Sequence, residues 1–139
     1  MNLATLRVEG LDEALDSIVE RLQLRLDARW RKGDPKSRGR GEHASAGLVA
    51  TVADTSNPVQ MIQCIRHFIA KCQAARLSFS NEQVSAEIAV GLTVGDSQQY
   101  VAFVDLGPSD MASLGSLGLG LSVAAYPTSD EANEADESE

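Results

Sequence analysis

The stretch from Asn57 to Ala75 constrains the fold most, because it combines clear helix-start signals with a long apolar stripe. Asn57 is a preferred N-cap residue, and Pro58 suits the first helical position. Apolar side chains then recur at helical spacing, at Met61, Ile62, Ile65, Phe68, Ile69 and Cys72. A stripe of this kind has to be buried against other elements. The sequence therefore predicts a long amphipathic helix over 58–75 that packs on a sheet.

Alternating apolar and polar residues predict the strands of that sheet. The alternation is cleanest over 84–94, and Gly10 ends a similar run near the N-terminus. Gly95 and Asp96 suit a tight turn, so the residues that follow are predicted to return as the second strand of a hairpin. The predicted strands are 4–9, 47–53, 84–94, 99–105 and 119–126.

Two further helices complete the pattern. Helical spacing predicts a helix over 12–22, and Pro108 opens a short helix that carries Met111, Leu114 and Leu117. Residues 23–45 are predicted to form a long polar loop. The predicted order of elements is β-α-β-α-β-β-α-β. This order indicates the α+β class, with a single twisted, mostly antiparallel sheet and helices packed on one face.

The chain is predicted to form one globular domain over 1–127, since its 139 residues match the commonest domain size. Residues 128–139 are predicted to be a disordered acidic tail, because six acids crowd into 130–139 with no apolar residue larger than Ala. We expect no signal peptide and no membrane span, and hence a cytoplasmic protein. Cys64 and Cys72 are expected to be reduced, buried thiols, too far apart on one helix for a disulfide.

Charge is divided unevenly along the chain. All twelve Lys and Arg residues lie at or before Arg76, whereas eleven of the twenty acids lie beyond it without any base. The net charge of −8 disfavours nucleic acid as a partner. The acidic second half is instead suited to a basic protein surface. Its candidate contact residues are Glu82, Glu87, Asp96, Asp105 and Asp110.

No set of residues in the sequence forms a catalytic signature. His43 is expected to be exposed, His67 is expected at the edge of the apolar stripe, and neither has a nucleophile at a suitable spacing. The glycine-rich segment 33–41 lacks the residues of a phosphate loop. Cys64, His67 and Cys72 match no zinc spacing. We therefore expect no enzyme, no metal and no cofactor.

The predicted loop holds the only tryptophan of the chain, in the run Trp30-Arg31-Lys32-Gly33-Asp34-Pro35, and six of the twelve basic residues lie between Arg29 and Arg40. Two interpretations are open. In the first, the indole covers an open end of the sheet while Lys32 and Asp34 pin the loop. In the second, Trp30 and Arg31 belong to a contact surface, because Trp and Arg are enriched at binding hot spots.

Several of these motifs resemble a bacterial domain-of-unknown-function family, family 4279. The resemblance rests on the opening strand, the helix with a Leu-rich end, the W-R-K-G-D-P loop and the segment L-x-S-L-G-L-G-L-S-V-x-x-Y at 114–126, and it spans Leu3 to Tyr126. Where that family usually has a further tryptophan, this chain has Glu42-His43-Ala44-Ser45. Small single-domain members of the family look like protective partners of bacterial toxins, so the resemblance implies an immunity role.

The expected function is a non-enzymatic cytoplasmic binding protein, specifically an immunity protein that neutralises a cognate toxin by occlusion. The expected partner-binding residues are Glu87, Asp105, Trp30, Arg31 and Lys32. The alternative is a small-ligand or nucleic-acid-responsive regulatory module that uses the basic Arg29–Arg40 loop. The sequence leaves the oligomeric state open.

Overall fold

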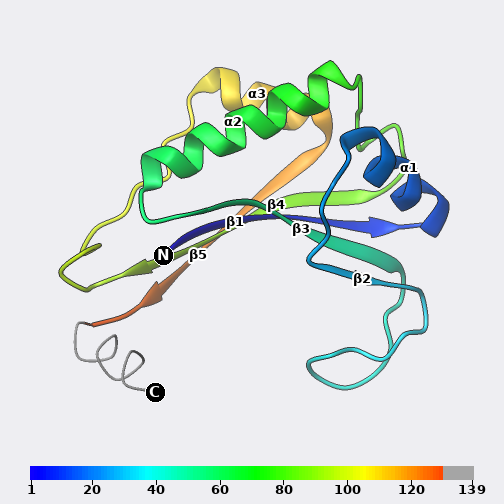
Figure 1. The fold of residues 1–139 in the computed structure, drawn as a ribbon, viewed down its shortest axis with the longest axis horizontal. Coiled ribbons are helices and arrows are strands. Elements are labelled where there is room, and N and C mark those ends of the chain that lie inside the picture. Colours follow the sequence, from blue (N-terminus) through cyan, green and yellow to red (C-terminus); the bar gives the residue numbers. More distant parts are fainter. Residues whose placement is uncertain (130–139) are drawn as a thin grey trace.

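The computed structural model describes residues 1–129, in which a single five-stranded sheet carries three helices on one side (Figure 1). The strands are β1 (Asn2–Gly10), β2 (Ala28–Trp30), β3 (Ala46–Thr55), β4 (Ser85–Val94) and β5 (Leu119–Pro127). The helices are α1 (Asp12–Leu22), α2 (Pro58–Ala74) and α3 (Pro108–Leu117). The predicted α+β class with one sheet is confirmed. Residues 130–139 of the predicted acidic tail lie outside the described residues.

The strands lie in the order β2-β3-β1-β4-β5, with β1 at the centre. All pairings are antiparallel except that of β4 with β5, which is parallel and is connected through α3. The short strand β2 pairs only with Gly47–Val49, so within residues 1–129 the second half of β3 has a strand partner on its β1 side alone.

The core lies between the sheet and the helices. Alternate residues of the strands point into it, among them Leu6, Leu48 and Ile88, and all three are fully buried. The residues of the other parity point to the opposite side of the sheet, which no helix within residues 1–129 covers (Figure 1). We call this side the uncovered face. It includes Thr5, Arg7, Glu9, Val49, Glu87, Ala89, Gly91, Ala124 and Tyr126.

Helix α2 forms as the sequence predicts. The side chain of Asn57 accepts a hydrogen bond from the backbone N–H of Val59 at 2.8 Å, and Pro58 occupies the first turn. All six residues of the predicted stripe are buried. Cys64 lies outside that stripe and is exposed, so the prediction of two buried thiols is wrong for Cys64 and right for Cys72.

The hairpin predicted after β4 does not form, and 99–105 is not a strand. Both sides of β4 are already occupied, by β1 and by β5. The buried carboxylate of Asp96 instead accepts the N–H groups of Gln98 and Gln99 and turns the chain away. The alternation that suggested a strand reflects packing, because Ala102, Val104 and Leu106 lie against the core without strand pairing.

One prediction about α3 also changes. Met111 of α3 is 52% exposed, so only Leu114 and Leu117 bury the helix face predicted there. Gly118 ends α3 in the left-handed conformation, with φ of 76°. Within the described residues, no helix has both the length and the apolar character that crossing a membrane would require.

Candidate binding surfaces

Trp30 lies in the short strand β2 and not in an irregular loop as predicted. Its indole covers the backbone of Gly47, its partner on β3, and a Cβ at Gly47 would overlap the Cζ2 atom of the ring. The indole Nε1 donates a hydrogen bond to the carbonyl of Ser45 at 3.1 Å. The ring of His43 stacks on the indole with centroids 4.6 Å apart, and the Arg7 guanidinium lies 5.2 Å from the centroid. Trp30 is therefore held at one end of the uncovered face.

These contacts correct the expectation that His43 is exposed, since its side chain is half-buried against Trp30. They also identify Gly47 as a residue that the sequence analysis missed. Gly47 was predicted only to begin a strand. A glycine at that position, within reach of the only tryptophan, is the signal that could have revealed the contact, because an aromatic ring can cover a strand glycine closely.

The loop after Trp30 is tied at its base. The carboxylate of Asp34 accepts the backbone N–H of Arg31 at 2.8 Å, and the N–H of His43 donates to the carbonyl of Asp34 at 2.8 Å. Asp34 thus pins the loop, as the first interpretation of this segment expects. Lys32 does not pin it, because its side chain is exposed and makes no hydrogen bond or ion pair within residues 1–129.

The basic residues of this segment fall into two groups. Arg29 faces α1, where its guanidinium contacts the carboxylates of Asp16 at 2.8 Å and Asp12 at 3.4 Å. The lysines and arginines beyond Arg31 are exposed. Lys36 and Arg38 line a cleft of about 500 Å³ beside Trp30 and His43. The exposed cations therefore project from the loop at one end of the uncovered face.

The two acids predicted to bind a partner lie on different surfaces. Glu87 belongs to the uncovered face, directly across from Arg7 on β1, and Arg7 in turn faces Val49 on β3. Asp105 lies on the helix side, in a small cleft beside Val59 and Ile62 at the start of α2. The fold therefore brings Glu87 to the same face as Trp30 and leaves Asp105 away from both.

The other three candidate acids are engaged inside the fold. Asp96 is buried in the turn after β4, and Glu82 forms an ion pair with Arg21 at 2.8 Å. Asp110 receives two hydrogen bonds from Arg66, at 3.0 and 2.9 Å. These bonds, together with the N–H of Gly107, lower the pKa of the Asp110 carboxyl. The acidic second half is thus not one free acidic surface.

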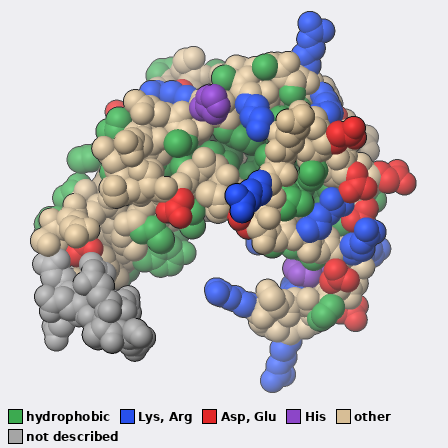
Figure 2. Space-filling model, viewed as in Figure 1, with side chains coloured by type: hydrophobic (Ala, Val, Ile, Leu, Met, Phe, Trp, Pro, Cys, Tyr) green, Lys and Arg blue, Asp and Glu red, His purple; other side chains and the backbone are tan. Residues whose placement is uncertain are grey.

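The lower side of the molecule, beneath the sheet, is hollowed. Figure 2 shows this concavity, with the loop of 31–45 projecting downward at one end of it. Small side chains such as Thr5 and Ala89 occupy the middle of the uncovered face, and Arg7 and Glu87 add both signs of charge toward the Trp30 end. The result is a broad concave surface with an aromatic and basic margin.

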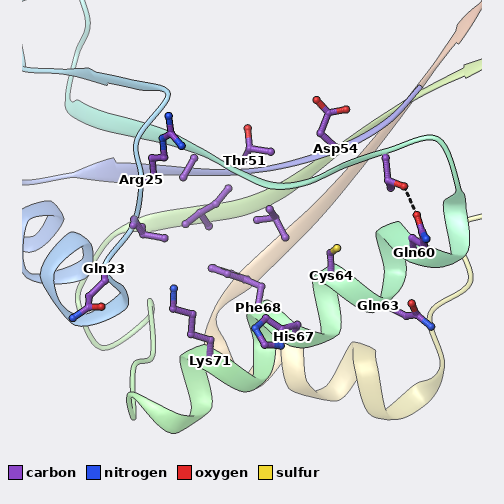
Figure 3. A pocket seen from close by; sticks show the side chains of 15 residues that line it. Gln23, Arg25, Thr51, Asp54, Gln60, Gln63, Cys64, His67, Phe68 and Lys71 are labelled. Carbon is purple, nitrogen blue, oxygen red and sulfur yellow. Dashed lines mark hydrogen bonds between the residues drawn. The ribbon is translucent and has the colours of Figure 1, made fainter.

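A second hollow, which was not predicted from the sequence, lies on the helix side of the molecule. It is a cleft of about 740 Å³ between the second half of β3 and helix α2 (Figure 3). Leu24, Val52 and Phe68 contribute apolar lining, while Arg25, Lys71 and Asp54 supply charge. No motif marks this cleft, because its lining comes from four separate segments of the chain.

The described residues include no group of three or more His, Cys, Asp or Glu side chains placed to hold a metal ion. The thiol of Cys72 is buried on the inner side of α2, and this burial raises its pKa to about 11.

Comparison with known protein families, curated proteins and solved structures finds no match to this chain.

Proposed function

We propose that this chain is a non-catalytic binding protein whose uncovered face covers a surface of a partner protein. The observation that carries the proposal is the concave side of the sheet, which no helix of the described chain covers. At its margin Trp30 is held by Gly47, His43 and Arg7. Tryptophan and arginine dominate the energetics of protein interfaces, and a preorganised ring loses little entropy on binding.

The specific role proposed is that of an immunity protein that neutralises a bacterial toxin by occlusion. To occlude a toxin, the immunity protein needs a large surface that is complementary to the toxin. It does not need to catalyse a reaction. The mixed charges of Arg7 and Glu87 would set the orientation of the partner, since charge pairs across an interface fix register and speed association. The cytoplasm is the compartment proposed, because both cysteines are free thiols and would stay reduced there.

The proposal is tested with the genes that flank this one. Each neighbouring product is expressed alone and together with this chain, and growth of the host is followed. We expect one neighbour to arrest growth, this chain to restore growth, and the two proteins to co-purify as a stable complex. If no neighbouring product arrests growth, or if growth is restored without complex formation, the immunity role is wrong.

One observation favours a second function, the binding of an anionic ligand such as a nucleic acid by the basic loop. Lys36 and Arg38 line a cleft beside the stacked rings of Trp30 and His43, and cations next to aromatic rings are typical of single-strand binding sites. Fluorescence anisotropy with a labelled single-stranded oligonucleotide tests this function. Salt-sensitive binding that is lost in Arg38→Glu would support it, and no binding at low salt would exclude it.

A further inference from the structure

Strand β3 has a free edge beside helix α2. Strand β2 accompanies β3 only as far as Val49, whose carbonyl accepts the N–H of Asp27 at 2.8 Å, and β2 adds no pairing beyond that point. Residues 50–55 are therefore paired with β1 on one side, while no strand of the described chain lies on the other. A free edge presents backbone donors and acceptors in the pattern that another strand can pair with.

The cleft of about 740 Å³ runs along this free edge. The helix α2 forms its other wall, and in Figure 3 the side chains of Cys64, Phe68 and Lys71 point from α2 toward the strand. Apolar side chains, including Leu24 and Val52, line the space between. An extended peptide that adds to a strand edge needs this combination, a backbone ladder on one side and a groove for alternate side chains beside it.

The charged residues of the cleft are separated along its length. Arg25 and Lys71 come from opposite walls toward one end of the cleft, and Asp54 lies toward the other end. In Figure 3 the Lys71 side chain points toward the strand, whereas the head groups of Arg25 and Asp54 point away from α2. Both cations are exposed, and neither forms an ion pair within residues 1–129. One end of the cleft is therefore suited to a carboxylate, and the polarity would fix the direction of a bound chain.

We infer that the cleft between β3 and α2 binds an extended peptide segment of a partner, with a carboxylate at the peptide's C-terminal end attracted by the two cations of that end, Lys71 and Arg25. The carboxylate is either a free C-terminus or an acidic side chain. With that end near Ala50, the peptide runs antiparallel to β3. Both the free edge and a bound strand rise about 3.3 Å per residue, so the free edge of about six residues accepts a peptide segment of about six residues. This site is distinct from the uncovered face, so it stands or falls independently of the proposed function.

The test begins with the full-length protein and a display library of random octapeptides with free C-termini. Selected peptides are synthesised, and their affinities are measured by fluorescence anisotropy. We expect the selected sequences to alternate apolar residues and to end in an acidic residue or to depend on the free C-terminus. Amidation of the C-terminus and replacement of the acidic residue by its amide distinguish the two sources of the carboxylate. If neither change weakens binding, the carboxylate assignment is wrong.

Two charge variants locate the site, and a third is their matched control. Lys71→Glu and Arg25→Glu are each expected to weaken peptide binding by about tenfold or more, since a charge-assisted hydrogen bond is lost and a repulsion replaces it. Arg40→Glu makes the same charge change at an exposed residue of the loop 31–45 that lines neither cleft, and it should leave binding unchanged. Equal losses in all three variants would mean general electrostatic attraction and would overturn the proposal.

The unaltered protein provides a further readout through its exposed thiol. Cys64 lines the cleft, whereas Cys72 is buried, so a thiol reagent at neutral pH reports on Cys64 alone. A saturating selected peptide should slow the modification of Cys64 several-fold. Peptides methylated on alternate backbone nitrogens should bind more weakly, because an added strand needs its backbone N–H groups to pair with β3. Full reactivity of Cys64 in the presence of bound peptide would place the peptide elsewhere and contradict the inference.

Discussion

The indole of Trp30 lies directly on the backbone of Gly47, its partner across strands β2 and β3, and leaves no space for a side chain there. This contact explains how a strand of only three residues is anchored at the margin of the sheet. It also fixes the start of the loop that carries the exposed lysines and arginines. The position of Trp30 at the margin of the uncovered face therefore depends on the absence of a side chain at Gly47.

Replacing Gly47 by Ala should displace the indole. The added methyl group overlaps Cζ2 of Trp30, so we expect the free energy of unfolding to fall by about 1–3 kcal/mol, the usual cost of overpacking. Thermal unfolding and tryptophan fluorescence measure the effect. In a Trp30→Ala background the same substitution should cost little or nothing. An equal cost in both backgrounds would show that the contact does not explain the loss.

The packing of α2 on the sheet gives a second prediction. Ile65 is fully buried, and its truncation in Ile65→Ala should lower the free energy of unfolding by about 2–5 kcal/mol through lost burial and a residual cavity. Denaturant titration provides the measurement. Gln63→Ala, on the exposed side of the same helix, is the control and should change stability by less than about 0.5 kcal/mol. A loss below about 1 kcal/mol for Ile65→Ala would contradict the buried stripe.

The buried thiol of Cys72 should make stability depend on alkaline pH. Its pKa rises from 9.0 to about 11 on folding, so the native state keeps a proton that the unfolded chain has released. The free energy of unfolding should therefore decline as pH rises from 9 toward 11. Denaturant titrations across this range test the effect. The decline should be shallower in Cys72→Ala and unchanged in Cys64→Ala, and identical slopes in all three proteins would refute the assignment.

Elements with local signals were predictable from the sequence. Helix α2 follows from the Asn57 cap and a stripe that spans about three helical turns, and the alternation of β4 identifies its buried side without reference to other strands. The segment 99–105 alternates equally well, but it is not a strand because β5, later in the chain, takes the place beside β4. Strand pairing is a non-local property, and alternation reports only which side chains are buried.

The candidate surfaces were predictable only in part, for the same reason. Trp30 and Glu87 were both chosen from the sequence, and the sheet brings them to one face. Asp105 was chosen with Glu87 because both are acids of the second half, yet it lies beside α2. The cleft of Arg25 and Lys71 has no sequence signal at all, since it exists only because β2 ends before β3 does.

The role proposed for the uncovered face is tested by the affinities of matched surface variants for the partner identified by growth rescue. Ala89→Arg places a large charged side chain in the middle of the uncovered face, and Glu87→Lys reverses a charge there. Both should weaken the complex by at least tenfold, whereas Asp105→Lys and Ala70→Arg, on the helix side, should leave the affinity unchanged. The affinities are measured by surface plasmon resonance, after thermal unfolding has shown that each variant is folded. If the helix-side variants weaken the complex and the uncovered-face variants do not, the partner binds elsewhere, and the proposal that the uncovered face binds it is wrong.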